Sequence, residues 1–183
     1  MSSVKKVCIS AICMALCCVL PTAFHSVGLG GVFCPMHLPV LLCGLLCGWP
    51  YGLVCGVAGP VLSFVASGSP GPSMMVSMVP ELCVYGLVTG LGMKLIHTGK
   101  TVTDVYASML PAMLLGRIVG GAAQAAFYLS SAKSYSIAIW ASAYFVQTAP
   151  GTVVQLVVLP ALVLVLGRAR LIPARYPKEG VPA

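Results

Sequence analysis

Two charged side chains, Glu81 and Arg117, stand inside long apolar stretches of the sequence. A charge at the centre of a membrane helix costs about 2.5–3.5 kcal/mol on insertion scales, so neither side chain is expected to face lipid. An arginine can hold a carboxylate or a phosphate with two hydrogen bonds. Two interpretations are therefore open: the residues form a structural ion pair, or one or both bind a polar ligand in a cavity that opens outward. Both can hold at once.

Four further polar residues in the apolar stretches are candidate ligand contacts: His37, Gln124, Gln147 and Gln155. Gln124 follows Arg117 by two helical turns, which places it on a related face of the same helix. Polar side chains of these types also form hydrogen bonds between membrane helices. The sequence leaves both roles open for each of the four.

Catalytic and metal-binding patterns are missing from the sequence. The nine cysteines include no Cys-x-x-Cys pair, so we expect neither a zinc site nor a redox site and interpret them as small apolar packing residues. No phosphate-binding loop of the Gly-Lys-Ser/Thr type occurs. We therefore expect no cofactor in this chain and no ATP hydrolysis by it. Any active transport would take its energy from a partner or an ion gradient.

The composition indicates that these residues belong to a membrane protein. Of 183 residues, 59% are hydrophobic and 7% are charged, whereas soluble domains carry about 25% charged residues. No charged residue occurs between Lys6 and Glu81 or between Lys133 and Arg168, and a helix needs roughly 20 apolar residues to cross a bilayer. The net charge of +7 comes from short segments between apolar stretches. This distribution is typical of topology signals and not of a nucleic-acid-binding face.

We expect an all-α membrane protein with six transmembrane helices, forming a single integral membrane domain over residues 1–183. The first span resembles a signal peptide, but no small-residue cleavage site follows it, so we interpret it as retained. The second span is short for a full crossing. Five crossings, with the second and third spans forming a re-entrant hairpin, are the alternative. The expected spans are 6–24, 34–48, 51–67, 74–96, 104–129 and 137–167, followed by a short basic cytoplasmic tail at 168–183.

The basic residues predict the orientation of the chain. With six spans and a cytoplasmic N-terminus, eight of the ten Lys and Arg residues lie in cytoplasmic segments, and the external loops hold only Lys133. Cytoplasmic loops of membrane proteins carry an excess of positive charge. Both the N- and C-termini are therefore expected in the cytoplasm.

Several segments of the sequence resemble the substrate-binding S component of energy-coupling factor (ECF) vitamin transporters. The length, the six expected spans and the cytoplasmic termini are also similar to those of that family. The similar segments are the stretch 35–44 with the glycines that follow it as far as Gly56, the run 115–120 around Arg117, and the run 150–152 with Gln155.

The pattern Ala11-x-x-x-Ala15 extends this resemblance. In the family, a small-residue stripe on the first helix docks onto the transmembrane coupling subunit, and small residues let helix backbones come close. The resemblance implies a transport protein, and not an enzyme, in a bacterial plasma membrane. It implies capture of a vitamin outside and its delivery inside with a transmembrane coupling (T) subunit and two ATPases that use the ATP. Among vitamins, Arg117 favours an acidic one, and pantothenate, with a carboxylate and an amide, is the substrate that we favour. A folate, riboflavin, a thiamine precursor and a cobalamin-type cargo are the other candidates.

Two other classes of function stay open. A stand-alone secondary transporter would use a proton carried by Glu81, and transport by the chain alone under a pH gradient would favour it. A membrane-embedded enzyme would need paired catalytic groups. The chain has three acidic residues, Glu81, Asp104 and Glu179, and the last two are expected at or beyond the cytoplasmic surface.

Overall fold

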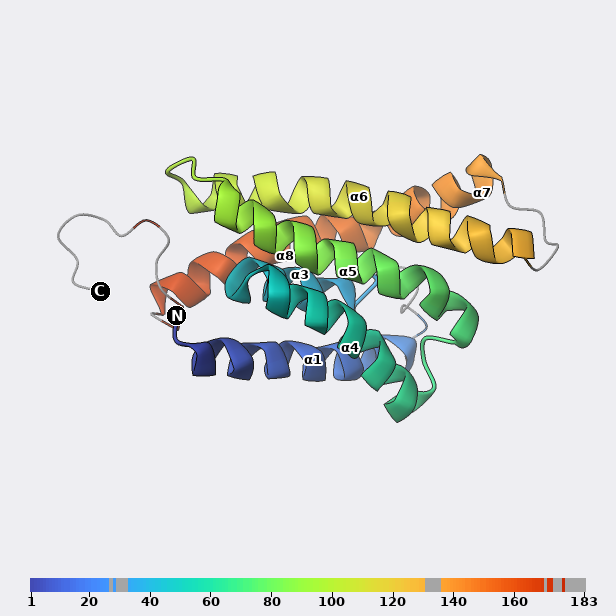
Figure 1. Ribbon diagram of the computed structural model, residues 1–183, viewed down its shortest axis with the longest axis horizontal. Coiled ribbons are helices and arrows are strands. Elements are labelled where there is room, and N and C mark those ends of the chain that lie inside the picture. Colours follow the sequence, from blue (N-terminus) through green and yellow to red (C-terminus); the bar gives the residue numbers. More distant parts are fainter. Residues whose placement is uncertain (27, 29–32, 131–135, 170, 173–175, 177–183) are drawn as a thin grey trace.

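The apolar stretches form helices that run along the long axis of the molecule (Figure 1). The structure is a computed structural model that describes residues 1–26, 28, 33–130, 136–169, 171–172 and 176. Over these residues it contains helices and no strands, so the expected all-helical fold is confirmed. The helices are α1 (Ser3–Ser26), α3 (His37–Cys47), α4 (Trp49–Ser67), α5 (Pro72–Leu95), α6 (Thr101–Ser130), α7 (Ile137–Ala141), the π-helix η1 (Ser142–Val146) and α8 (Ala149–Arg168).

Five helices in the described part are long and apolar enough to cross a membrane: α1, α4, α5, α6 and α8. The second expected span, 34–48, contains only the 11-residue helix α3, which is about half the length that a crossing needs. The last expected span, 137–167, is divided into α7, η1 and α8. By helix length, five spans are shown in the described part of the chain, and the expected count of six stays a prediction.

A tight turn at Gly48 separates α3 from α4. Its φ of 94° lies in the region that favours glycine. Pro50, in the first turn of α4, has no N–H to donate to a preceding turn. The chain therefore ends one helix and begins another within a few residues, and α3 packs against both α4 and α5.

Glycines set the close approach of α4 to α5. A Cβ added at Gly86 would collide with the backbone of Gly52, and one added at Gly90 would collide with the backbone of Trp49. In a membrane, where lipid is as apolar as the side chains, such close backbone packing is a main source of helix association. These small-residue stripes thus serve packing inside the bundle.

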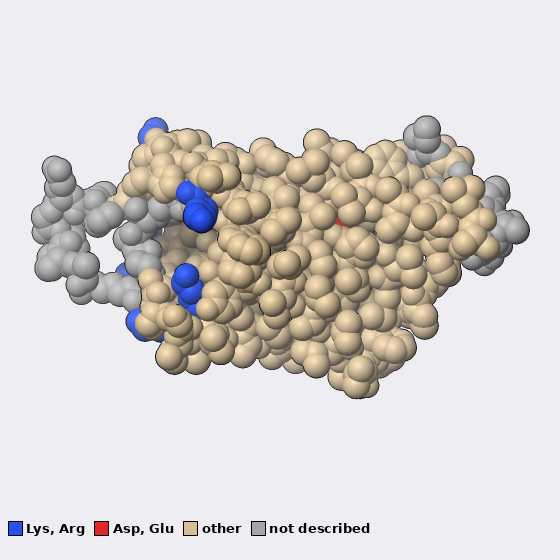
Figure 2. Space-filling view, in the orientation of Figure 1, with Lys and Arg blue, Asp and Glu red and all other residues tan. Residues whose placement is uncertain are grey.

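Basic side chains gather at one end of the molecule (Figure 2). The N-terminus and the start of α6 lie at this end, as do the last turns of α5 and α8 (Figure 1). We call it the basic end. Its described basic residues are Lys5, Lys6, Lys94, Lys100 and Arg168.

Candidate functional site

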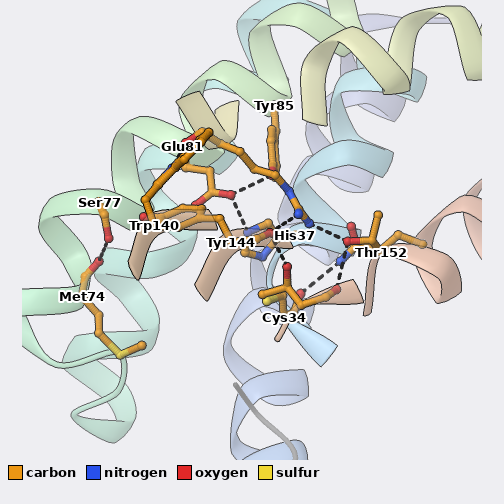
Figure 3. A network of polar contacts seen from close by, with 12 residues as sticks. Cys34, His37, Met74, Ser77, Glu81, Tyr85, Trp140, Tyr144 and Thr152 are labelled. Atoms are coloured by element: carbon orange, nitrogen blue, oxygen red, sulfur yellow. Dashed lines mark hydrogen bonds and ion pairs between the residues drawn. The ribbon is translucent and has the colours of Figure 1, made fainter. Parts of the chain in front are cut away.

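A buried polar cluster forms around Glu81 of α5 (Figure 3). Glu81 Oε1 accepts a hydrogen bond from the hydroxyl of Tyr85 at 2.7 Å and lies 3.4 Å from Nε2 of His37. Glu81 and His37 are each only 6% exposed. The Tyr85 and His37 rings pack together with centroids 5.2 Å apart. One carboxylate thus contacts both an aromatic hydroxyl and an imidazole in the interior of the bundle.

The helices explain why these three side chains meet. Glu81 and Tyr85 are four residues apart on α5 and therefore lie one above the other on the same face. His37 is the first residue of α3. Because α3 is short, its N-terminal turn lies inside the bundle and not at an end, at the level of Glu81.

Arg117 of α6 lies nearby with partners of its own. It is 8% exposed, and its guanidinium donates hydrogen bonds to the backbone carbonyl of Tyr144 in η1 and to Oγ1 of Thr152 in α8. It also lies 5.2 Å from the centroid of the Phe145 ring, at cation–π distance. Glu81 and Arg117 form no direct ion pair with each other: Glu81 pairs with His37.

The π-helix η1 supplies the carbonyl that Arg117 contacts. The N–H of Gln147 bonds to the carbonyl of Ser142, five residues back, and the Tyr144 carbonyl accepts from both Arg117 and the Thr148 hydroxyl. Single π turns of this kind occur frequently at functional sites. Trp140, one turn earlier, donates from Nε1 to the Arg117 carbonyl at 3.3 Å.

The three candidate glutamines have different surroundings. Gln155 is 3% exposed, and its Nε2 donates to the Cys34 carbonyl at 3.5 Å. That carbonyl also accepts the N–H of His37 at 3.0 Å, so Gln155 joins the cluster. Gln124 lies one turn beyond Gly120, which packs against Glu81, and Gln124 Oε1 is buried without a hydrogen-bond partner among the described residues. Gln147 is exposed, and no side-chain contact brings it into the cluster.

Three groups in this site are absent from the candidates that the sequence indicates. Tyr85 follows Glu81 by four residues, and this spacing is a signal that was present in the sequence. The carbonyls of Tyr144 and Cys34 take part through the backbone. Backbone groups leave no mark on residue type, so no sequence pattern could have indicated them.

The two alanines expected to dock onto a partner lie on the outside of α1. Ala11 and Ala15 are exposed, whereas Cys13 and Cys17 of the same helix are 2% and 0% exposed. The cysteines pack α1 into the bundle, which turns the alanine stripe away from it. This face of α1 is covered by no other part of the described chain.

Asp104, expected at or beyond the cytoplasmic surface, is fully buried in the first turn of α6. Its carboxylate accepts from the N–H and hydroxyl of Thr98 at 2.9 and 2.7 Å and from the Tyr176 hydroxyl at 2.7 Å. It thus ties the start of α6 to the preceding loop and to a residue beyond α8. These contacts are structural and lie apart from the cluster around Glu81.

Comparison with known proteins assigns the chain to a family. No curated protein and no solved structure matches it with significance. The family model of the ECF transporter, substrate-specific component, matches residues 5–163. The match runs from the start of α1 through most of α8 and includes the cluster around Glu81. This protein therefore belongs to the family of substrate-specific components of ECF transporters, as its sequence motifs indicated.

Proposed function

We propose that this protein captures a vitamin or related micronutrient from outside the cell at the cluster around Glu81. The observation that carries the proposal is two unsatisfied buried atoms: His37 Nδ1 and Gln124 Oε1 have no hydrogen-bond partner in the described structure. An unpaired buried polar group costs about 1–3 kcal/mol. A polar ligand that bonded to these atoms would remove that cost. Unpaired buried atoms of this kind are therefore expected where a substrate-specific component binds its substrate.

We favour a substrate with an acidic group, with pantothenate as the leading candidate. A guanidinium has five N–H donors, and Arg117 uses two of its nitrogens on Tyr144 and Thr152. Its remaining donors can take a ligand carboxylate. The amide and hydroxyl groups of pantothenate suit His37, Gln124 and Gln155. Gln147, being exposed, would contact this ligand only if the region around η1 moved.

The proposed orientation has both termini in the cytoplasm. α1 begins and α8 ends at the basic end (Figure 1), which fits an even number of crossings and the excess of positive charge on cytoplasmic surfaces. The segment between α1 and α4, in which α3 is a described helix, would make the sixth crossing. We infer that the whole chain forms one domain in a bacterial plasma membrane.

Delivery of the substrate requires partners. The chain has no ATP-binding loop, so we propose that a transmembrane coupling subunit and two cytoplasmic ATPases supply the energy. The exposed alanine stripe at Ala11 and Ala15 is the surface that would contact the coupling subunit. Alanines permit a close approach of a partner helix.

Mass spectrometry of small molecules released from the purified protein tests the proposed function. Protein purified from vitamin-rich medium should carry one vitamin at close to one molecule per chain, and the Glu81→Gln variant from the same medium should carry much less. An empty wild-type protein would contradict capture at high affinity. Proton-driven uptake by the chain alone in liposomes, without ATPases, would instead identify a secondary transporter.

A further inference from the structure

A cavity opens at the basic end, away from the cluster around Glu81. Its volume is about 380 Å³, within the range of about 300–1,000 Å³ that small-molecule sites occupy. It is formed by the start of α1, the turn between α3 and α4, and the end of α5, and it shares no residue with the cluster. Figure 2 shows the surface hollowed between basic side chains at this end. The lining residues are Lys6, Leu45, Leu46, Cys47, Gly48, Trp49, Pro50, Gly90, Met93 and Lys94.

Lys6 points toward this cavity because it lies on the inner face of α1. It precedes Ser10, Cys13 and Cys17 by four, seven and eleven residues, and all three are buried. Its carbonyl accepts the Cys47 thiol at 3.5 Å, and its Nζ lies 5.9 Å from the centroid of the Tyr51 ring. The position of Lys6 is therefore fixed by contacts with α3 and α4, on the side of α1 opposite to the alanine stripe.

The cavity carries positive charge that the described protein does not neutralise. Lys6 and Lys94 line it from two helices, and no acidic residue lines it. The acidic residues that the structure describes have other partners: Glu81 pairs with His37, and Asp104 bonds to Thr98. A concave surface lined by charges of one sign concentrates its field and attracts counter-ions. An anion is the complementary occupant.

The position of the cavity favours a lipid as the source of that anion. It lies at the ends of membrane-spanning helices, and Trp49 on its rim is 40% exposed. Tryptophan and lysine are the residues that sit at membrane interfaces. Leu45, Leu46 and Met93 add apolar wall beside the lysines. Basic pockets between membrane helices are suited to anionic headgroups.

We propose that Lys6 and Lys94 bind the phosphate of an anionic phospholipid whose headgroup enters this cavity. Such a lipid would fill the gap between α1 and α5 on the membrane surface. It would act independently of the substrate, because the cavity and the cluster around Glu81 have no residue in common.

Fluorescence quenching by brominated lipids tests this site directly. The chain has two tryptophans, and Trp140 lies beside Glu81 and Arg117 (Figure 3) and does not line the cavity. A Trp140→Phe background therefore leaves Trp49 as a reporter on the cavity rim. The protein is reconstituted in phosphatidylcholine vesicles that contain a small fraction of brominated phosphatidylglycerol or, for comparison, brominated phosphatidylcholine. Trp49 should be quenched preferentially by the anionic lipid.

Charge variants show whether the two lysines cause the preference. Lys6→Gln and Lys94→Gln should each weaken the preference for phosphatidylglycerol about fivefold, the factor that one lysine contributes near an anionic surface. Lys5→Gln is the matched control, because Lys5 is adjacent on α1 but exposed and outside the cavity. It should change the preference less than twofold. Thermal unfolding of each variant checks that the fold is kept.

Three outcomes would overturn the proposal. If Lys5→Gln weakened the preference for phosphatidylglycerol as much as the two cavity variants, the preference would come from the overall charge of the protein and not from the cavity. Relief of the quenching by millimolar inorganic phosphate would assign the cavity to a soluble phosphate in place of a lipid. If Lys6→Gln and Lys94→Gln left the lipid quenching unchanged but weakened binding of the coupling subunit, the cavity would be a protein contact and not a lipid site. None of these readouts involves the substrate, so they are independent of the proposed function.

Discussion

The Glu81 carboxylate and the His37 imidazole lie 3.4 Å apart, although 44 positions separate the two residues in the chain. Tyr85 donates to the same carboxylate oxygen. Because the pair is buried in an apolar bundle, it is strongly affected by the loss of either partner. His37 Nδ1, on the other side of the ring, is left without a partner. The pair thus presents a polar ring edge that a ligand can use.

Replacing Glu81 by Gln should lower substrate affinity at least about tenfold. The variant keeps the shape of the side chain but removes the charge that orients His37, and hydrogen bonds to charged groups contribute about 1.5–3 kcal/mol. Titration calorimetry with the substrate identified by mass spectrometry measures the change. Tyr85→Phe removes only one neutral donor and should cost less. Unchanged affinity in Glu81→Gln would exclude the cluster as the binding site.

Two glutamines of α8 and its preceding turn make a matched pair. Gln155 is buried and bonds to the Cys34 carbonyl, whereas Gln147 is exposed. Gln155→Ala should weaken substrate binding about five- to tenfold, because it releases the segment that carries His37. Gln147→Ala should change it less than twofold. A larger effect at Gln147 than at Gln155 would show that the ligand binds nearer to η1.

Arg117→Lys tests whether the fork of the guanidinium is needed. A lysine keeps the charge but lacks the planar fork with which Arg117 contacts both Tyr144 and Thr152. We expect faster hydrogen exchange over residues 142–148 and at least about tenfold weaker substrate binding, since both η1 and the ligand carboxylate lose a donor. Binding equal to that of the wild type would remove the argument for an acidic substrate.

Bulky residues on the outer face of α1 should block assembly and spare binding. The double variant Ala11→Leu with Ala15→Leu covers the exposed stripe and should abolish co-purification with the coupling subunit, because a partner helix can no longer approach closely. Ala122→Leu with Ala126→Leu is the control, since these alanines are exposed with the same spacing on α6. Assembly that persists in the α1 variant would place the docking surface elsewhere.

Gly86→Ala should destabilise the protein, because its Cβ would collide with the backbone of Gly52 and force α4 and α5 apart. Overpacking of this kind typically costs about 1–3 kcal/mol. Gly167→Ala is the matched control: its Cβ would meet no atom within 4 Å, and alanine favours the helix. Thermal unfolding in detergent compares the two. A Gly86→Ala protein as stable as Gly167→Ala would contradict the close packing of α4 and α5.

The sequence by itself determined the class of the protein and most of its helices. Long charge-free stretches leave few alternatives in a bilayer, since every backbone group must be bonded inside its own helix. The ends of α4, α5 and α6 fall within three residues of the expected limits at 51–67, 74–96 and 104–129. The family followed from local motifs and is confirmed over residues 5–163. The position of Glu81 and Arg117 inside apolar stretches likewise made them candidate binding residues from the sequence alone.

Only the tertiary structure decided which partners these charges have. The sequence left open a pair of Glu81 with Arg117, but the short α3 brings His37 to Glu81, and η1 turns a carbonyl toward Arg117. Both effects depend on where a helix ends or widens. Packing against neighbouring helices and backbone hydrogen bonds set these positions, and residue type does not reveal backbone hydrogen bonds. The separation of buried Gln155 from exposed Gln147 has the same origin. Residue type indicates that a polar group needs a partner, and the packing of the helices determines which partner it meets.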